Sequence, residues 1–437
     1  MIVVMCRRIM FWIHGGCFVY GSAAGYDGAQ LAQEYDMVVV VVQYRLGAFG
    51  FLGGDALRSR DPARGSTGNW GLLDNLAALQ WVQANGAAFG GDPKQVTIFG
   101  ESSGAGSVSQ LLGVPSAWPY FQRAIMESGA ASFWTYLTLE AAASSYDKVV
   151  QGAGCAKEAQ PLKCLLASGP ALTTAVTTVP CRDGCNWAPT IDGTLISGKT
   201  IELARAGKLR PNTPIISGFN LHDGAEFVTG YPYALHHMTE DKLERYFRSR
   251  YGEERVQTLQ GLFPVPGQWP TETQLSPFFY AAQRCETDFS YACSAFWLTA
   301  TRPSGTAFVY QFSHPSSKNG LSLHGDEIPY VFGTVANPTP ADKNVERSMM
   351  TYWTNFARTG DPNGRQPVNR SLSRGGQPSQ DESLLRWPAW TSQQGAVLNI
   401  TASPSIASVP LDQFQGCSFF DEHWDFYGGC LPPSETH

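Results

Sequence analysis

The stretch Val96-Thr97-Ile98-Phe99-Gly100-Glu101-Ser102-Ser103-Gly104 gives the clearest indication of the fold. A short apolar strand runs into the pattern Gly-x-Ser-x-Gly, and residues 105–112 continue with the spacing of a helix. Glycines at positions 100 and 104 allow a sharp turn that presents the Ser102 hydroxyl, and the helix N-terminus offers N–H groups to a developing oxyanion. Because this pattern also arises by chance in a chain rich in glycine and serine, a nucleophile at Ser102 needs partner residues.

A serine nucleophile needs a histidine base and an acid that orients the histidine. In folds that place the serine on such a sharp strand-to-helix turn, here called the elbow (residues 100–104), the three residues follow the chain order serine, acid, histidine. Each of them lies on a loop after a strand. Asp223 follows the predicted strand 214–217, and His324 follows the predicted strand 307–312. A turn-forming Asp-Gly and a surface or helix-capping imidazole are the alternatives. We predict Asp223 as the acid and His324 as the base, because both occur together with the elbow.

A glycine-rich loop, His14-Gly15-Gly16-Cys17-Phe18, follows the predicted strand 9–13 and precedes the elbow. Its glycines let backbone N–H groups approach a substrate closely, although a tight turn would require them as well. An oxyanion hole combines the N–H group after the nucleophile with donors from an earlier loop of this type. We therefore favour the oxyanion hole over the plain turn.

Short β-branched or apolar strands alternate with turns and helical patterns along most of the chain. The predicted strands are residues 9–13, 38–44, 96–99, 124–126, 214–217 and 307–312. Several lack polar alternation, which is typical of parallel strands covered by helices on both faces. Apolar spacing over residues 69–85 predicts a helix that packs on the sheet. We predict one α/β domain over residues 1–437, with a mostly parallel central sheet flanked by helices and a mainly helical insertion at about residues 239–300.

Composition excludes several classes of function. The 437 residues are 43% hydrophobic, enough for a large core and too apolar for a disordered chain. A net charge of -6 with 16% charged residues leaves no basic field for nucleic acid. No apolar run approaches the roughly 18 residues that span a bilayer, so we expect no transmembrane segment. The apolar residues 9–13 lead straight into the glycine-rich loop, which indicates a strand rather than a signal peptide.

Most of the ten cysteines lie close to another cysteine in the sequence. The near neighbours are Cys155 and Cys164, Cys181 and Cys185, Cys285 and Cys293, and Cys417 and Cys430. This spacing favours local disulfides over a zinc site, because paired Cys-x-x-Cys motifs are absent. Two sequons make Asn369 and Asn399 candidates for glycosylation. The cysteines and sequons together predict a secreted protein, although no signal peptide is recognised in the sequence.

Seven motifs spread over nearly the whole chain form a consistent series. They are WIHGG at 12–16, YRLGAFGFL at 44–52, GNWGL at 68–72, FGGDP at 89–93, FGESSG at 99–104, HGDEIPY at 324–330 and WTNFARTGDP at 353–362. With these motifs the chain resembles the type B carboxylesterase and lipase family, which includes cholinesterases and fungal secreted lipases. The resemblance implies an α/β-hydrolase fold and the hydrolysis of esters.

The resemblance also implies roles for individual residues. Ser102 matches the nucleophile, His324 the base, and Asp223 stands where the family more often has Glu. The implied donors of the oxyanion hole are the backbone N–H groups of Gly16, Cys17 and Ser103. Cys17 replaces the usual Gly or Ala, so a side chain crowds the acyl side while the backbone donor is kept; Ser103 replaces an Ala of similar volume. Cys155 and Cys164 match a disulfide of the family.

The family normally has roughly a hundred residues before the glycine-rich loop, so the resemblance implies that this chain is N-terminally incomplete and lacks the first strands. The strand at 38–43 would then form one edge of the sheet. Its five consecutive valines would favour association with another chain. The aromatic residue that binds choline in cholinesterases falls in the absent segment, so we do not expect cholinesterase activity.

These observations predict a carboxylic ester hydrolase that acts through an acyl-enzyme on small-molecule or lipid esters and needs no metal or organic cofactor. The alternatives are a noncatalytic cholinesterase-like binding or adhesion domain and a truncated, inactive fragment. The filled positions at Ser102, Asp223 and His324 favour the enzyme.

Overall fold

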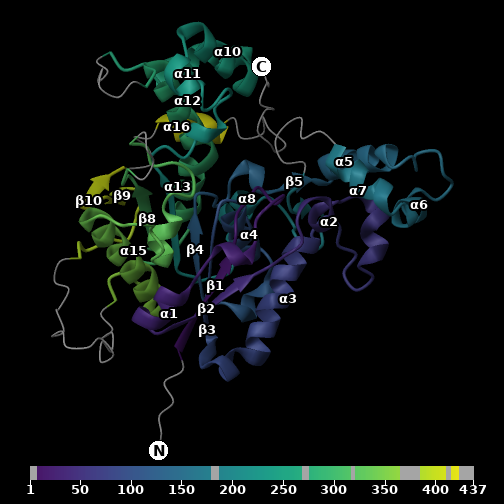
Figure 1. Cartoon of the computed structure of the whole chain (residues 1–437), viewed down its shortest axis with the longest axis horizontal. Helices are drawn as coiled ribbons and strands as arrows, with labels where there is room; N and C mark the ends of the chain where they lie inside the picture. Colours follow the sequence, from purple (N-terminus) through teal and green to yellow (C-terminus); the bar gives the residue numbers. More distant parts are fainter. Residues whose placement is uncertain are drawn as a thin grey trace, which may run out of the picture.

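An eight-stranded sheet runs through the centre of the computed structural model, which describes residues 7–178, 187–267, 275–315, 320–364, 384–409 and 415–422 (Figure 1). The strand order is β10-β9-β8-β7-β4-β3-β1-β2. Neighbouring strands are parallel except for the antiparallel pair β9 and β10. The strands are β1 (Arg7–Ile13), β2 (Met37–Val42), β3 (Gly91–Glu101), β4 (Arg123–Glu127), β7 (Ile215–Asn220), β8 (Ala307–Phe312), β9 (Ala396–Ile400) and β10 (Ser405–Ser408). The prediction of a mostly parallel α/β sheet is confirmed.

Strand β1 shows why the sequence lacks polar alternation. Phe11 and Ile13 pack into a hydrophobic cluster on one face of the sheet, while Met10 and Trp12 pack into a second cluster on the other face. All four side chains are fully buried. Side chains of a strand alternate between faces, so a strand covered on both sides needs apolar residues at every position.

Helices cover both faces of the sheet. One cluster is covered by α3 (Trp70–Asn85), α4 (Ser103–Leu112), α5 (Leu139–Gly152) and α13 (Cys293–Ala300), and the other by α1 (Ala29–Tyr35), α14 (Ile328–Phe332) and α15 (Pro340–Thr359). The helix predicted over residues 69–85 is α3. Further helices in the described ranges are α2 (Gly47–Phe51), α6 (Pro161–Ala167), α7 (Pro170–Thr178), α8 (Thr200–Arg205), α9 (Ala234–His237) and α16 (Gln415–Glu422). A separate parallel pair joins β5 (Leu137–Thr138) to β6 (Thr190–Ile191).

Residues 239–300 are mainly helical where the structure describes them. They form α10 (Glu240–Tyr251), α11 (Val256–Leu262), α12 (Pro277–Thr287) and α13, between β7 and β8 in the chain. Figure 1 shows α10, α11 and α12 grouped together beyond one end of the sheet, while α13 lies closer to the strands. The assignment of the whole chain to one domain stays a prediction.

Strand β2 ends the sheet, as predicted for the valine-rich strand. In the described part of the chain it pairs only with β1. Val38 and Val40 pack toward one hydrophobic cluster, and Val39 and Val41 toward the other. Its faces are therefore covered, whereas its outer edge pairs with no other described strand, and association through this edge stays a prediction.

Two disulfides join described cysteines. The bond between Cys155 and Cys164 agrees with its prediction. The predicted neighbours Cys285 and Cys293, and Cys417 and Cys430, are wrong as pairs, because Cys293 is bonded to Cys417.

Helix geometry explains the first of these errors. Residues 277–300 form a continuous helical run through the π-helix η9 (Asp288–Ala292), so residues 285 and 293 are separated by about 12 Å along it, too far for a disulfide. Cys285 is buried and not disulfide-bonded. Cys181, Cys185 and Cys430 lie outside the described residues.

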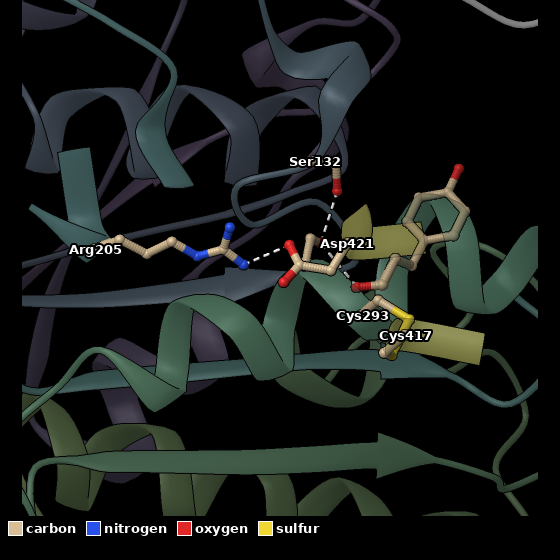
Figure 2. The surroundings of a disulfide bond; sticks show 7 residues. Ser132, Arg205, Cys293, Cys417 and Asp421 are labelled. Atoms are coloured by element: carbon tan, nitrogen blue, oxygen red, sulfur yellow. Dashed lines mark hydrogen bonds and ion pairs between the residues drawn. A yellow bond between two sulfur atoms is a disulfide. The ribbon is translucent and has the colours of Figure 1, made fainter. Parts of the chain in front are cut away.

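The bond between Cys293 and Cys417 fastens α16 to α13 (Figure 2). Beside it, Arg205 at the end of α8 forms an ion pair with Asp421 of α16 at 2.5 Å. Phe420 of α16 is buried in the core. A C-terminal helix is thereby tied to the helical region by a covalent bond, an ion pair and apolar packing.

Removal of the Cys293–Cys417 bond should destabilise the protein more than removal of the Cys155–Cys164 bond. The first spans 124 residues and the second 9, and a longer closed loop restricts the unfolded chain more. We expect Cys293→Ser with Cys417→Ser to lower the free energy of unfolding by about 4 kcal/mol, and the matched double variant of the short loop by less. Urea denaturation measures both; an equal or reversed ranking would contradict the prediction.

Candidate active site

Ser102 occupies a strained turn between β3 and α4. Its backbone has φ 54° and ψ -125°, a conformation that is unfavourable for a residue with a side chain. A Cβ atom at Gly104 would lie 1.9 Å from the carbonyl oxygen of Ile13, and one at Gly100 would lie 2.6 Å from the same oxygen. The pattern Gly-x-Ser-x-Gly is thus a steric requirement of packing this turn against the end of β1.

His324 and Asp223 meet on loops that follow β8 and β7. His324 Nδ1 and Asp223 Oδ1 are 2.7 Å apart and form a hydrogen bond. Asp223 is fully buried, and its Oδ2 accepts hydrogen bonds from the Ser128 hydroxyl at 2.8 Å and the Asn220 backbone N–H at 2.7 Å. The carboxylate is therefore fixed by three donors, which leaves the second imidazole nitrogen to act elsewhere.

That second nitrogen, His324 Nε2, lies at the base of the elbow. It is 3.2 Å from Glu101 Oε1, the side chain directly before Ser102. Among the described residues, Nε2 is buried and forms no hydrogen bond, so the structure does not place a hydrogen bond between Ser102 and His324. Hydrogen bonds between nucleophile and base are often long without substrate and tighten when it binds.

The glycine-rich loop packs directly over the nucleophile. A Cβ atom at Gly15 would lie 3.0 Å from Ser102 Cβ and 2.5 Å from Glu101 Oε2, so only glycine fits here. The Tyr44 hydroxyl donates to the His14 carbonyl at 2.7 Å, and the two rings stack at 4.5 Å. The loop that the sequence associates with an oxyanion hole is therefore held beside Ser102.

Cys17 is strained at its position in this loop. Its φ of 51° lies in the left-handed region, where a residue with a side chain is unfavourable by roughly 1–2 kcal/mol. Its side chain is half-buried, and the thiol is not in a disulfide. The backbone conformation explains why Gly would be preferred here, and the strain shows that the loop is held by its surroundings.

Three buried glutamates near the site were not predicted from the sequence: Glu101 and Glu327 act electrostatically on His324, and Glu127 acts on Glu101. Burial raises the pKa of Glu101, of Glu127 and of Glu327 above the ordinary value for glutamate. Burial alone would lower the pKa of His324, but the carboxylates of Glu101 and Asp223 raise it. This field stabilises an imidazolium at His324, the species formed when a base removes a serine proton.

Glu127 also supports the nucleophile through its backbone. Its carbonyl accepts the Ser102 N–H at 2.9 Å, and its Oε1 accepts the indole N–H of Trp353 at 2.7 Å. A charged residue in an apolar strand is the one sequence signal that could have marked it, since buried carboxyls are rare without a specific role.

His222, next to the acid, connects the two loops that carry the acid and the base. Its backbone N–H donates to the Ser322 carbonyl at 3.0 Å, and its Nδ1 accepts the Ser322 N–H at 3.1 Å. Burial lowers the pKa of His222 to about 4, so the ring stays neutral and Nδ1 remains an acceptor. Ser322 is two residues before His324, so His222 fixes the start of the loop that positions the base.

Replacement of His222 by alanine should impair any reaction that depends on His324. The change leaves the buried Ser322 N–H without its acceptor, at a cost of roughly 1–3 kcal/mol, and we expect kcat for an ester to fall about tenfold with little change in KM. His222→Asn keeps an acceptor near Nδ1 and should retain most of the activity. Equal impairment of both variants, or of neither, would contradict this role.

The structure describes only one of the two predicted glycosylation sites. Asn399 lies half-buried in β9 and Asn369 outside the described residues, so glycosylation stays a prediction. Among the described residues, no group of His, Cys, Asp or Glu side chains is arranged to hold a metal ion. No helix in the described ranges has both the length and the apolarity to cross a membrane.

Comparison with known proteins decides the family. Residues 5–416 match the model of the carboxylesterase family. The chain is 34% identical to mouse cholinesterase over 91% of its own length and 66% of that protein, and 33% identical to human cocaine esterase over 91% and 69%. The chain belongs to the carboxylesterase family. It thus spans about two thirds of the length of these relatives.

Solved structures of carboxylesterases have the same fold. The carboxylesterase EST55 of Geobacillus stearothermophilus aligns with a TM-score of 0.75 at 28% identity, covering 94% of this chain and 82% of that one. A structure described as PNB esterase aligns with a TM-score of 0.74, also at 28% identity. The α/β-hydrolase fold implied by the motifs of this carboxylesterase family member is confirmed.

Proposed function

We propose that the chain is a carboxylic ester hydrolase with a triad of Ser102, His324 and Asp223. His324 Nε2 accepts the proton of Ser102 Oγ as Oγ bonds to the ester carbonyl carbon. The resulting imidazolium then gives this proton to the departing alcohol, which leaves an acyl-enzyme. Water, deprotonated by His324, attacks the acyl carbon, and the carboxylic acid departs as Ser102 regains its proton.

The contact between His324 and Asp223 is the observation that carries this proposal. A buried carboxylate at 2.7 Å from Nδ1 fixes the tautomer that leaves Nε2 able to accept a proton. Nε2 faces Glu101, adjacent to Ser102 in the chain. Glu226, the nearest alternative acid in sequence, has an exposed side chain, and no hydrogen bond joins it to His324 in the described structure, which supports Asp223 over Glu226.

The oxyanion hole in this proposal uses backbone donors. As the tetrahedral intermediate forms, its oxygen accepts hydrogen bonds from the N–H groups of Gly16, Cys17 and Ser103. The packing of Gly15 against Ser102 and the position of Ser103 at the start of α4 support this assignment. The Cys17 side chain lies next to the acyl side, so it restricts the bulk of the acyl group.

Small-molecule or lipid esters are the proposed substrates. The test is hydrolysis of p-nitrophenyl esters with acyl chains of increasing length by the purified chain, with labelling by an organophosphate in parallel. We expect turnover and stoichiometric labelling. A noncatalytic binding domain or an inactive fragment would give neither, even though the protein is folded by circular dichroism.

We also propose that the protein is exported. The disulfides Cys155–Cys164 and Cys293–Cys417 support this, because such bonds form and persist in oxidising compartments. Thiol counting on protein from its native source tests it: two cross-linked pairs at these positions are expected, and four reduced thiols would contradict export.

A further inference from the structure

A hollow of about 1000 Å³ lies beside the short disulfide, between α5, α6 and the 3₁₀ helix η2 (Asp55–Arg60). A second hollow of about 250 Å³ adjoins it, and the two share Arg60, Leu162 and Leu166 as wall residues. Neither is lined by Ser102 or His324. Figure 1 shows α5, α6 and α7 well apart from α10, α11 and α12. Because they share these wall residues, the two hollows lie next to each other, and together they are called here the α6 groove.

The walls of the α6 groove are mostly apolar. Tyr146 and Val150 of α5 line the larger hollow, and their side chains are buried. Leu166 of α6 and Phe49 of α2 remain 54% and 55% exposed. The rest of the smaller hollow adds Ala48, Leu52, Leu57, Trp70, Leu165, Leu172 and Val176. Covering large exposed apolar side chains in a depression with an apolar chain is favourable, because it removes apolar surface from water.

Cations are placed unevenly along the α6 groove. Lys157 and Lys163 line only the larger hollow, and Arg60 lies where the two hollows meet. Asp147 is the acidic residue that lines the groove. Within the described ranges, the side chains of the three cations form no ion pair or hydrogen bond. The larger hollow therefore has uncompensated positive charge.

The smaller hollow differs, because its second cation is already neutralised. Arg45 forms an ion pair with Asp74 at 2.7 Å. Beyond Arg60, this hollow thus offers apolar surface without an uncompensated charge. An anionic head fits the larger hollow and an apolar tail the smaller one, which is the division of an amphipathic anion.

We propose that the α6 groove binds a single long-chain carboxylate. The carboxylate lies near Lys157 and Lys163, and the acyl chain passes Leu162 and Leu166 toward the smaller hollow. The groove itself is argued from its geometry and charge; the choice of carboxylate over another anion rests on the proposed function, because ester hydrolysis releases carboxylates. The disulfide Cys155–Cys164 closes the segment that carries Lys157, so the charged wall is covalently fixed.

Equilibrium dialysis with radiolabelled laurate, kept below its micellar concentration, tests this site on the full chain. We expect Lys157→Glu with Lys163→Glu to weaken laurate binding at least tenfold. Leu166→Asp, at an exposed position, should weaken it similarly through the apolar wall. The matched control Lys148→Glu reverses a charge on α5 outside the groove lining and should bind laurate as the unaltered chain does.

Other modes of laurate binding would give different results in these experiments. Laurate held in a catalytic pocket would keep its affinity in the charge-reversed variant, which would overturn the proposal. Dodecanol, with the same chain and no charge, should bind at least tenfold more weakly, and equal binding would also overturn it. Binding to anionic phosphatidylglycerol vesicles without monomeric laurate binding would indicate a membrane contact instead. Dialysis needs no turnover, so it also tests a chain that hydrolyses no ester. If such an inactive chain bound laurate, the proposed function would be refuted and the proposed laurate site would stand.

Discussion

Replacement of Ser102 by alanine is expected to lower ester turnover by about 10⁶-fold, because the acyl-enzyme cannot form without Oγ. The strained backbone of Ser102 is set by glycines on both sides, so alanine keeps the turn. Initial rates with p-nitrophenyl acetate measure the loss. A loss of less than tenfold would show that another group attacks the ester.

Ser103→Ala is the matched control for this change. The Ser103 hydroxyl is buried and has no hydrogen-bond partner among the described residues, and the proposed contribution of Ser103 is its backbone N–H. Near-normal turnover is expected. A loss comparable to that of Ser102→Ala would mean that the two variants damage the turn rather than the chemistry.

Replacement of Asp223 by asparagine is expected to lower kcat by about 10⁴-fold. An amide can donate to Nδ1 and so favours the wrong tautomer of His324. It also removes the negative charge that raises the His324 pKa. The amide oxygen of asparagine can still accept the hydrogen bonds that the Ser128 hydroxyl and the Asn220 N–H donate to Asp223 Oδ2, so the fold should persist. Steady-state kinetics and circular dichroism together measure the effect.

Glu226→Gln serves as the comparison for the acid. Partial desolvation raises the pKa of Glu226, and His324 is close enough to act on it electrostatically, but no hydrogen bond joins the two. We expect less than a tenfold loss in kcat. If Glu226→Gln were the more damaging change, the acid of the triad would have to be reassigned to Glu226.

The elbow and the order of the site residues could be predicted because each is a local requirement. Only glycine fits at positions 100 and 104, because a side chain there would collide with the end of β1. This steric requirement appears in the sequence as glycines close to Ser102. Most strands of the central sheet are recognisable for a similar reason, since burial on both faces demands continuous apolar stretches such as residues 9–13.

The features of the fold that were not predicted from the sequence depend on contacts between distant segments. Cys293 pairs with Cys417 across 124 residues, and spacing alone does not determine disulfide connectivity. Strand β10 has four exposed residues with no apolar pattern, and it forms only by pairing with β9. Charged residues are usually on the surface, so apart from the apolar strand that contains Glu127 the sequence did not mark Glu101 or Glu127 as buried.

Peptide mapping after reaction with an organophosphate is the most direct test of the central claim, that Ser102 is activated by His324 and Asp223. Mass spectrometry should find one phosphorylated serine, at position 102, in the unaltered chain. The same modification should be much slower in Asp223→Asn and undetectable in Ser102→Ala. Phosphorylation at another serine, or labelling of Ser102 at an unchanged rate in Asp223→Asn, would contradict the triad.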